Sequence, residues 1–511
     1  MGETDSENGK TGNEEKGSGN MPNEDLPADI QNLYVTVYAF NMFTITDGAI
    51  RLIVLFHANA LGFTPLDIAV LFSLYEFMGM ITNMFGGIAG NRFGLKCTML
   101  TSLFLQLIGL SLLALIDTIF GELNEETEGS VKSKAIGYIT FCQALSGVSK
   151  DFMKLSCKSM PKLVTKANAE DKLFRIVAWV TGWKNALKGF GTILGAVLVQ
   201  FIGFNPAIYV LIGIIVLIFP APLFFMTPGI GKSLNRPVAS LSVFQKPWNI
   251  NVLSLARFFL FGSRDVWFEI AAPIFLRSVL GWDEYQVGLF MGSYIIIYGQ
   301  IQKDTSKMYK SAKKNNSGSD KKSCRPKCLQ GVPKREHVPN WGWANGVEIL
   351  LLGIILYPLY QDYAGAEAEL FLNPNSTMAQ DEFDRYGNIL AGVLITGFFL
   401  FAFFFAVNSA IHSYLIVSYA GKDKVTMDIG FYYMANAGGR LVGTILSGWI
   451  YEETEERWGL SVCLWVSSGF MFLAAFVSYW LKDEPKVGIA EEEVIAETVT
   501  GKADREEMQT A

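Results

Sequence analysis

The chain has 511 residues, of which 50% are hydrophobic, 13% are aromatic and only 18% are charged. Soluble globular proteins carry about 25% charged residues, so this composition argues against an ordinary soluble enzyme. The formal net charge is −6. Much of it lies in two polar, acidic end segments, residues 1–30 and 482–511, which we expect to be disordered cytoplasmic tails.

Long apolar runs account for the shortage of charge. Residues 391–417, for example, contain one histidine and no full charge, and a helix needs about 20 apolar residues to cross a bilayer. The sequence therefore predicts an all-α membrane protein with twelve transmembrane helices. In chain order the predicted spans are 31–56, 66–90, 97–117, 135–157, 173–202, 206–226, 250–276, 286–302, 341–360, 388–417, 428–450 and 459–481.

The distribution of Lys and Arg among the loops predicts the orientation, because cytoplasmic loops carry an excess of basic residues. With the N-terminus inside, the inner loops hold 22 basic residues against five in the outer loops. We therefore expect a plasma-membrane protein with both termini in the cytoplasm. In the outer loop after the ninth span, Asn375 begins an Asn-Ser-Thr sequon and is a candidate glycosylation site.

The first and seventh spans resemble each other, which indicates a duplicated six-helix half. Asp47 aligns with Asp265 and Arg51 with Glu269, and a Leu-Gly pair follows in both segments after a one-residue shift. Two parallel six-helix halves are the architecture of major facilitator transporters. The predicted domains are an N-terminal half at 31–226, a cytoplasmic linker at 227–249, and a C-terminal half at 250–481 with a basic cytoplasmic loop at 303–339.

The loop between the second and third spans carries a second feature of these transporters. The segment GGIAGNRFGLK resembles the major facilitator loop motif G-x-x-x-D-R-x-G-x-K, with Asn in place of the usual Asp. Glycines permit a tight turn, whereas loss of the Asp removes one partner of the usual gating salt bridge. A plain basic loop is the alternative interpretation. The motif positions are Gly87, Asn91, Arg92, Gly94 and Lys96.

Ionisable residues inside the predicted spans are the sharpest functional signal. Each costs at least about 2.5–3.5 kcal/mol at a helix centre, so a cluster of them cannot face lipid. In spans 1, 4, 5, 7 and 11, which line the central cavity in the major facilitator arrangement, we count eight cations and four carboxylates as candidate cavity residues. The cations are Arg51, Lys150, Lys154, Lys184, Lys188, Arg257, Arg264 and Arg440, and the carboxylates are Asp47, Asp151, Asp265 and Glu269.

This surplus of positive charge predicts a multiply charged anionic substrate. Arg offers a bidentate fork for phosphate-like and carboxylate oxygens, and Lys adds a point charge. Lys154 and Arg257 lie near the cytoplasmic face and fit equally well as side chains that snorkel to the membrane surface. The predicted substrate-binding residues are Lys184, Lys188, Arg264, Arg440, Arg51 and Lys150.

Two carboxylates are candidates for proton coupling. Asp47 and Asp265 occupy matching places in the two halves, and each lies beside an arginine that could capture or release it. For Asp47 the alternative is a static ion pair with Arg51 that fixes the helix. Glu76, in the second span, is a separate candidate for the same role.

Other classes of chemistry lack their motifs. The three histidines, His57, His337 and His412, are far apart and have no metal-site or catalytic spacing. No Walker loop or dinucleotide fingerprint is present. We therefore expect no enzyme activity, no cofactor, no metal and no nucleic-acid partner, but a secondary transporter in a lipid bilayer that uses an ion gradient, with protons as the coupling ion.

From about residue 33 to 481 the chain closely resembles the ArsJ-type organoarsenical efflux permeases, in segments that include TDGAIRLIVLFHANALGFTPLDIAVLF, QALSGVSKDFMKLSCKS, TGWKNALKGFG and GFYYMANAGGRLVGTILSGWIY. The resemblance implies export of 1-arseno-3-phosphoglycerate, which forms when glyceraldehyde-3-phosphate dehydrogenase uses arsenate in place of phosphate. It also implies a functional link to that enzyme. Without the resemblance, the residues predict only that the substrate is a multivalent organic anion.

Two further hypotheses stay open. The chain is either a facilitator for another phosphorylated organic anion, or a transporter-like sensor or scaffold whose tails signal while its pore is idle. The tails, the basic insert 303–339 and the outer loop 361–388 depart from the bacterial members of the family and suggest a eukaryotic relative.

Overall fold

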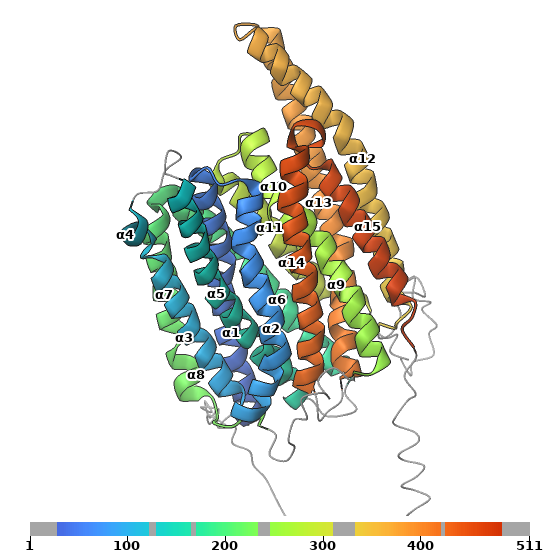
Figure 1. Ribbon diagram of the computed structural model, residues 1–511. Coiled ribbons are helices and arrows are strands. Elements are labelled where there is room, and N and C mark those ends of the chain that lie inside the picture. Colours follow the sequence, from blue (N-terminus) through green and yellow to red (C-terminus); the bar gives the residue numbers. More distant parts are fainter. Residues whose placement is uncertain are drawn as a thin grey trace, which may run out of the picture.

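The computed structural model describes residues 28–121, 129–164, 170–232, 246–309, 333–420 and 425–482. Regular structure within these ranges is entirely helical, which confirms the predicted fold class. Twelve long helices of these ranges form the bundle in Figure 1. They are α1 (Ala28–Ala60), α2 (Pro65–Phe93), α3 (Leu95–Leu113), α5 (Gly129–Val164), α6 (Glu170–Ile202), α7 (Phe204–Ile218), α9 (Trp248–Phe268), α11 (Glu284–Met308), α12 (His337–Leu372), α13 (Thr377–Tyr419), α14 (Val425–Trp458) and α15 (Ser461–Ser478).

Four short elements extend these helices. They are α4 (Ile116–Phe120), α8 (Pro220–Phe225), α10 (Ala271–Ile274) and the π-helical turn η2 (Phe275–Val279). Nearly all of the predicted tails lies outside the described residues, as do residues 233–245 of the predicted linker and 310–332 of the basic loop.

Eight helical segments of the described chain are long and apolar enough to cross a membrane by length and composition alone. The bundle helices that fall short are α5, α9, α11 and α14. Buried charges explain the low hydropathy of α5, α9 and α14, since these helices carry Asp151, Asp265 and Arg440 in the interior of the bundle. The charged residues that lower the hydropathy of these three helices are therefore the residues that surround the cavity described below.

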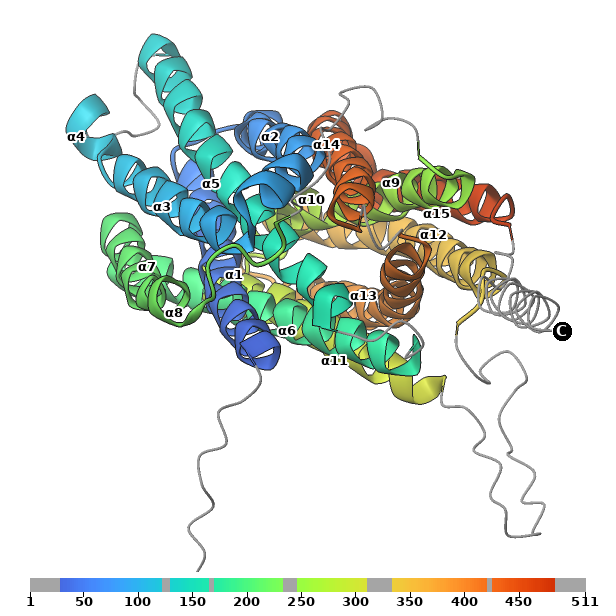
Figure 2. The ribbon, with the colours of Figure 1, turned by 90° about the horizontal axis from the view of Figure 1, so that it is seen from below.

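The long helices pack as two sets. In the first, α6 packs against α1, and α5 packs against both α2 and α3; in the second, α9 packs against α14 and α15, and α12 against α13 and α15. The sets meet extensively along two helix pairs, α2 with α14 and α6 with α11. Figure 2 shows this division from the end of the bundle where α1 begins. We call that end the termini face, because α15 also ends there.

The α6–α11 contact is made backbone to backbone. A Cβ atom added at Gly189 would lie 2.4 Å from the carbonyl oxygen of Gly292, and one added at Gly292 would lie 2.6 Å from the carbonyl oxygen of Gly189. Small residues allow membrane helices to approach this closely. The two halves therefore have no room for a side chain at this crossing.

The same turn occurs at corresponding places in the two halves. Gly62 and Gly281, the glycines of the aligned Leu-Gly pairs, adopt positive φ angles of 71° and 66°, which glycine adopts without steric cost. A capping box follows each of them, formed by Thr64 at the start of α2 and by Asp283 at the start of α11. This shared local structure agrees with the repeat seen in the sequence.

The predicted outer loop 361–388 is mostly helical. The α12 helix continues to Leu372 and α13 begins at Thr377, so the two helices project beyond the rest of the bundle as a hairpin, at the top of Figure 1. Ala, Glu and Leu are strong helix formers, and the Ser376 hydroxyl accepts a hydrogen bond from the Ala379 amide at the start of α13. Asn375 lies exposed at the tip, and its glycosylation stays a prediction.

We predict that Gly189→Ala or Gly292→Ala destabilises the protein by about 1–3 kcal/mol, because the new methyl group overpacks the crossing of α6 and α11. Thermal unfolding of the purified protein measures this loss. Gly213→Ala in α7 is the matched control, because nothing lies within 4 Å of its added Cβ. Equal melting temperatures for all three variants would contradict the close contact.

Candidate functional site

A central cavity of about 130 Å³ lies between the two sets of helices and is lined by residues of α1, α2, α5, α6, α9, α10, α11, α13 and α14. The lining includes four carboxylates, and a fifth, Asp265, is fully buried and bonded to two of the lining arginines. These groups leave four positive charges without a negative counterpart. The basic residues of the lining are Arg51, Lys150, Lys154, Lys158, Lys184, Lys188, Arg257, Arg264 and Arg440.

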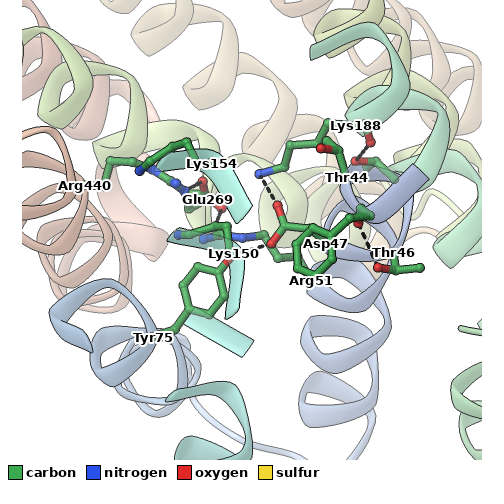
Figure 3. A network of polar contacts seen from close by, with 12 residues as sticks. Thr44, Thr46, Asp47, Arg51, Tyr75, Lys150, Lys154, Lys188, Glu269 and Arg440 are labelled. Carbon is green, nitrogen blue, oxygen red and sulfur yellow. Dashed lines mark hydrogen bonds and ion pairs between the residues drawn. The ribbon is translucent and has the colours of Figure 1, made fainter. Parts of the chain in front are cut away.

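The centre of this site is an ion-pair network that joins the two halves, made of Arg51, Glu76, Asp265, Glu269 and Arg440. Arg51 of α1 contacts both Glu76 of α2 and Glu269, which follows α9. Arg440 of α14 places Nη2 3.1 Å from Glu76 Oε1 and 2.7 Å from Glu269 Oε1, and its Nε lies 2.7 Å from Asp265 Oδ2. Each arginine therefore holds a carboxylate of its own half and one of the opposite half. Figure 3 shows Arg51, Glu269 and Arg440 close together.

The candidate proton-coupling residues are both engaged. Asp47 accepts a hydrogen bond from the Tyr75 hydroxyl and lies 3.6 Å from Lys188 Nζ. Asp265 binds Arg264, whose Nε lies 2.6 Å from Oδ1, as well as Arg440. Within the described residues Asp47 thus pairs with α6 rather than with Arg51, because Arg51 is directed to the ion-pair network.

Two lysines of α5 share the remaining carboxylates. Lys150 Nζ lies 3.5 Å from Glu76 Oε2 and 3.8 Å from Asp151 Oδ2, and it lies 3.9 Å from the centre of the Tyr75 ring. Lys154 contacts Asp151 one turn earlier on the same helix. Six cations and five carboxylates are thereby drawn into ion pairs around the middle of the cavity.

Three cavity cations have no carboxylate oxygen within ion-pair distance in the described part of the chain, and we call them the basic triad: Lys158, Lys184 and Arg257. Lys158 is 7% exposed and donates to the hydroxyl of Thr181. Arg257 is 4% exposed and donates to Asn436 Oδ1 at 3.0 Å and to the Ser409 hydroxyl at 3.0 Å.

The structure places all six predicted substrate-binding residues on this cavity and adds residues that the sequence did not assign to it. Lys158 was expected in a loop, but α5 continues to Val164 and carries it into the interior. Lys150, Lys154 and Lys158 follow one another at intervals of four residues. Residues at this spacing share one face of a helix, so the sequence did contain a signal that Lys158 faces the cavity. Arg257 is buried among polar partners rather than directed to the membrane surface.

Glu76 has a larger role than its sequence position indicated. It is 1% exposed and lies within ion-pair distance of Arg51, Lys150 and Arg440. As an isolated acidic residue in the middle of a mostly apolar span, it belonged to no sequence pattern that indicated these partners.

The motif between α2 and α3 contacts its own half of the molecule. Gly94 has a φ of 88°, the Leu95 amide donates to the Ile230 carbonyl at 2.9 Å, and Lys96 Nζ donates to the Met226 carbonyl at 2.8 Å. Arg92 is exposed. Gly87 and Asn91 lie outside the residues whose side-chain surroundings are described, and a gating role for the motif stays a prediction.

Comparison with known proteins identifies the family. The sequence profile of the Major Facilitator Superfamily matches residues 35–303, more than half of the chain. The chain belongs to the major facilitator superfamily. It is therefore a multi-pass membrane protein of a transporter family. No curated protein matches it in sequence.

A solved structure supports the same fold. The crystal structure of the human organic anion transporter MFSD10 (TETRAN) is similar with a TM-score of 0.57 and 12% sequence identity. The match covers 89% of this chain and 100% of that chain. At 12% identity, this similarity shows that the two proteins share the same arrangement of helices.

We predict strong energetic coupling between Arg440 and Glu76 across the two halves. Removing one partner of a buried pair costs about 3–5 kcal/mol, because it leaves an uncompensated charge. The double variant Arg440→Gln/Glu76→Gln should therefore lose at least about 1 kcal/mol less stability than the sum of the single losses. Thermal or denaturant unfolding of the four proteins measures the difference, and strictly additive losses would refute the cross-half pair.

Proposed function

We propose that this major facilitator protein is a secondary active transporter that exports a multiply charged organic anion, and that the anion is 1-arseno-3-phosphoglycerate. The observation that carries the proposal is the excess of four positive charges around a cavity buried between the two halves. Uncompensated charges in a low-dielectric interior are costly. A bound anion supplies the missing negative charge, so the cavity favours an anion over a neutral or cationic substrate.

Two further observations support the choice of substrate. The resemblance to ArsJ-type permeases covers nearly all of the helices, and 1-arseno-3-phosphoglycerate carries both a phosphate and an arsenate group that match a cationic cavity. The structural neighbour MFSD10 is described as an organic anion transporter. We propose that glyceraldehyde-3-phosphate dehydrogenase supplies the substrate.

Export requires a defined orientation in the membrane. We propose that both termini face the cytoplasm and that the protein resides in the plasma membrane, because basic residues gather in the loops on the side of the termini. The termini face of the bundle is then the cytoplasmic side, from which a metabolic intermediate reaches the cavity.

Expression of the protein in arsenic-sensitive cells should raise tolerance to arsenate and leave tolerance to arsenite unchanged. The protection should disappear when glyceraldehyde-3-phosphate dehydrogenase is inactive, because the organoarsenical is then not made. Growth curves with both oxyanions, with empty vector as the control, measure this. Equal protection against arsenate and arsenite would contradict the proposed organoarsenical substrate. Efflux of phosphorylated anions without any arsenate protection supports the second substrate class.

Proton coupling is the proposed energy source, with Asp47 and Asp265 as the groups that exchange the proton. Both carboxylates are paired with cations, so separation of those pairs when the helices rearrange during transport would let the carboxylate accept a proton. Transport by Asp47→Asn or Asp265→Asn protein in vesicles should therefore lose part of its pH dependence. A full wild-type pH profile in both variants excludes these carboxylates as the coupling groups.

A further inference from the structure

We infer that the basic triad of Lys158, Lys184 and Arg257 binds the most highly charged end of the substrate, a phosphate-type oxyanion dianion. The inference rests on the proposed transport of an anion and deepens it by placing that anion within the cavity. It differs in part from the sequence-based expectation, which also included Lys184 but grouped it with Lys188, Arg264, Arg440, Arg51 and Lys150 rather than with Lys158 and Arg257.

The distribution of charge in the cavity favours this location. The six cations outside the basic triad are held in ion pairs by five carboxylates, so that part of the site is nearly neutral. Three of the four uncompensated charges belong to the triad. An anion entering near Arg264 or Arg440 would have to displace Asp265 or Glu269, whereas one entering at the triad displaces no carboxylate of the described chain.

The members of the triad come from both halves and face the same space. Lys158 lies on α5, Lys184 on α6 and Arg257 on α9, and all three line the cavity. Like charges that line one buried cavity repel one another, because the low-dielectric interior screens them poorly. A dianion between them converts this repulsion into attraction and links the two halves.

The hydrogen-bonding capacity of the triad fits an oxyanion. Arg257 uses Nε and Nη1 for Asn436 and Ser409, which leaves Nη2 without a hydrogen-bond partner among the described residues. Lys184 has no hydrogen bond or ion pair there either, so all three of its ammonium protons are available. A tetrahedral dianion has enough acceptor oxygens for these donors, whereas a monocarboxylate would leave most of the positive charge unmatched.

Two members of the triad also lie on the expected loading side. Arg257 is nine residues from the first residue of α9 and Lys158 six from the last residue of α5, which places them about 14 Å and 9 Å from the termini face at 1.5 Å per residue. Glu269, at the far end of α9, joins Arg51 deeper in the bundle. The Arg51–Glu269 pair therefore lies farther from the termini face than Lys158 and Arg257, whereas Lys184, fourteen residues from the first residue of α6, lies at about 21 Å.

Ligand binding to purified protein in lipid nanodiscs tests this inference. The probes are 3-phosphoglycerate, which carries a phosphate and a carboxylate, and D-glycerate, which lacks the phosphate. We expect Lys184→Gln and Arg257→Gln each to weaken 3-phosphoglycerate binding about tenfold or more, because each removes charge-assisted hydrogen bonds to the phosphate. Binding of D-glycerate should change far less. Lys184→Arg should retain most of the affinity.

The controls separate the two levels of the proposal. Arg385→Gln removes one positive charge at an exposed position of α13 outside the cavity and should bind as the wild type does. Lys184→Gln removes no hydrogen bond or ion pair of the described structure, so it should fold normally. Wild-type affinity in both triad variants, with loss in Arg264→Gln, overturns the inference and leaves anion transport intact. Wild-type protein that binds neither probe and moves no anion overturns the proposed function itself.

Discussion

The burial of nine cations with only five carboxylates between two helical halves is the constraint on which the rest of the structure depends. Side chains of this kind cannot face lipid, so the helices that carry them must turn them inward and surround them with other helices. The positions of α5, α9 and α14 follow from this requirement. So does the cavity, because unpaired cations need space for a ligand or water that a packed apolar core would not leave.

The two parts of the cavity have different roles. In the ion-pair network, Arg51 and Arg440 each connect carboxylates of both halves and so favour the closed arrangement of the helices around them. In the basic triad, cations from both halves have no carboxylate partners in the described chain, and under the proposed function their mutual repulsion opposes closure until an anion binds. Substrate can thereby shift the balance between conformations, because it interacts differently with the open and the closed arrangement.

Much of the fold could be predicted from the sequence, because span length and hydropathy report directly on the bilayer. The charge surplus was also visible, since two lysines such as Lys184 and Lys188 in a long apolar run are too costly to face lipid and must line a polar interior. Which cation pairs with which carboxylate was not predictable. Arg51 contacts Glu269 across 218 positions of sequence, and nothing local to either residue distinguishes that contact from a pair with Asp47. Lys158 was missed because the predicted span ended at residue 157, whereas α5 continues past its apolar residues to Val164.

A structure of the protein with 3-phosphoglycerate bound is the most direct test of the account. Electron cryomicroscopy of the protein in nanodiscs should show the phosphate within hydrogen-bond distance of Lys184 and Arg257, with the Arg51–Glu269 contact still formed on the far side of the ligand. A phosphate seated instead on Arg264 and Arg440, with Asp265 and Glu269 displaced from them, would contradict the division of the cavity into a closed ion-pair network and a free basic triad.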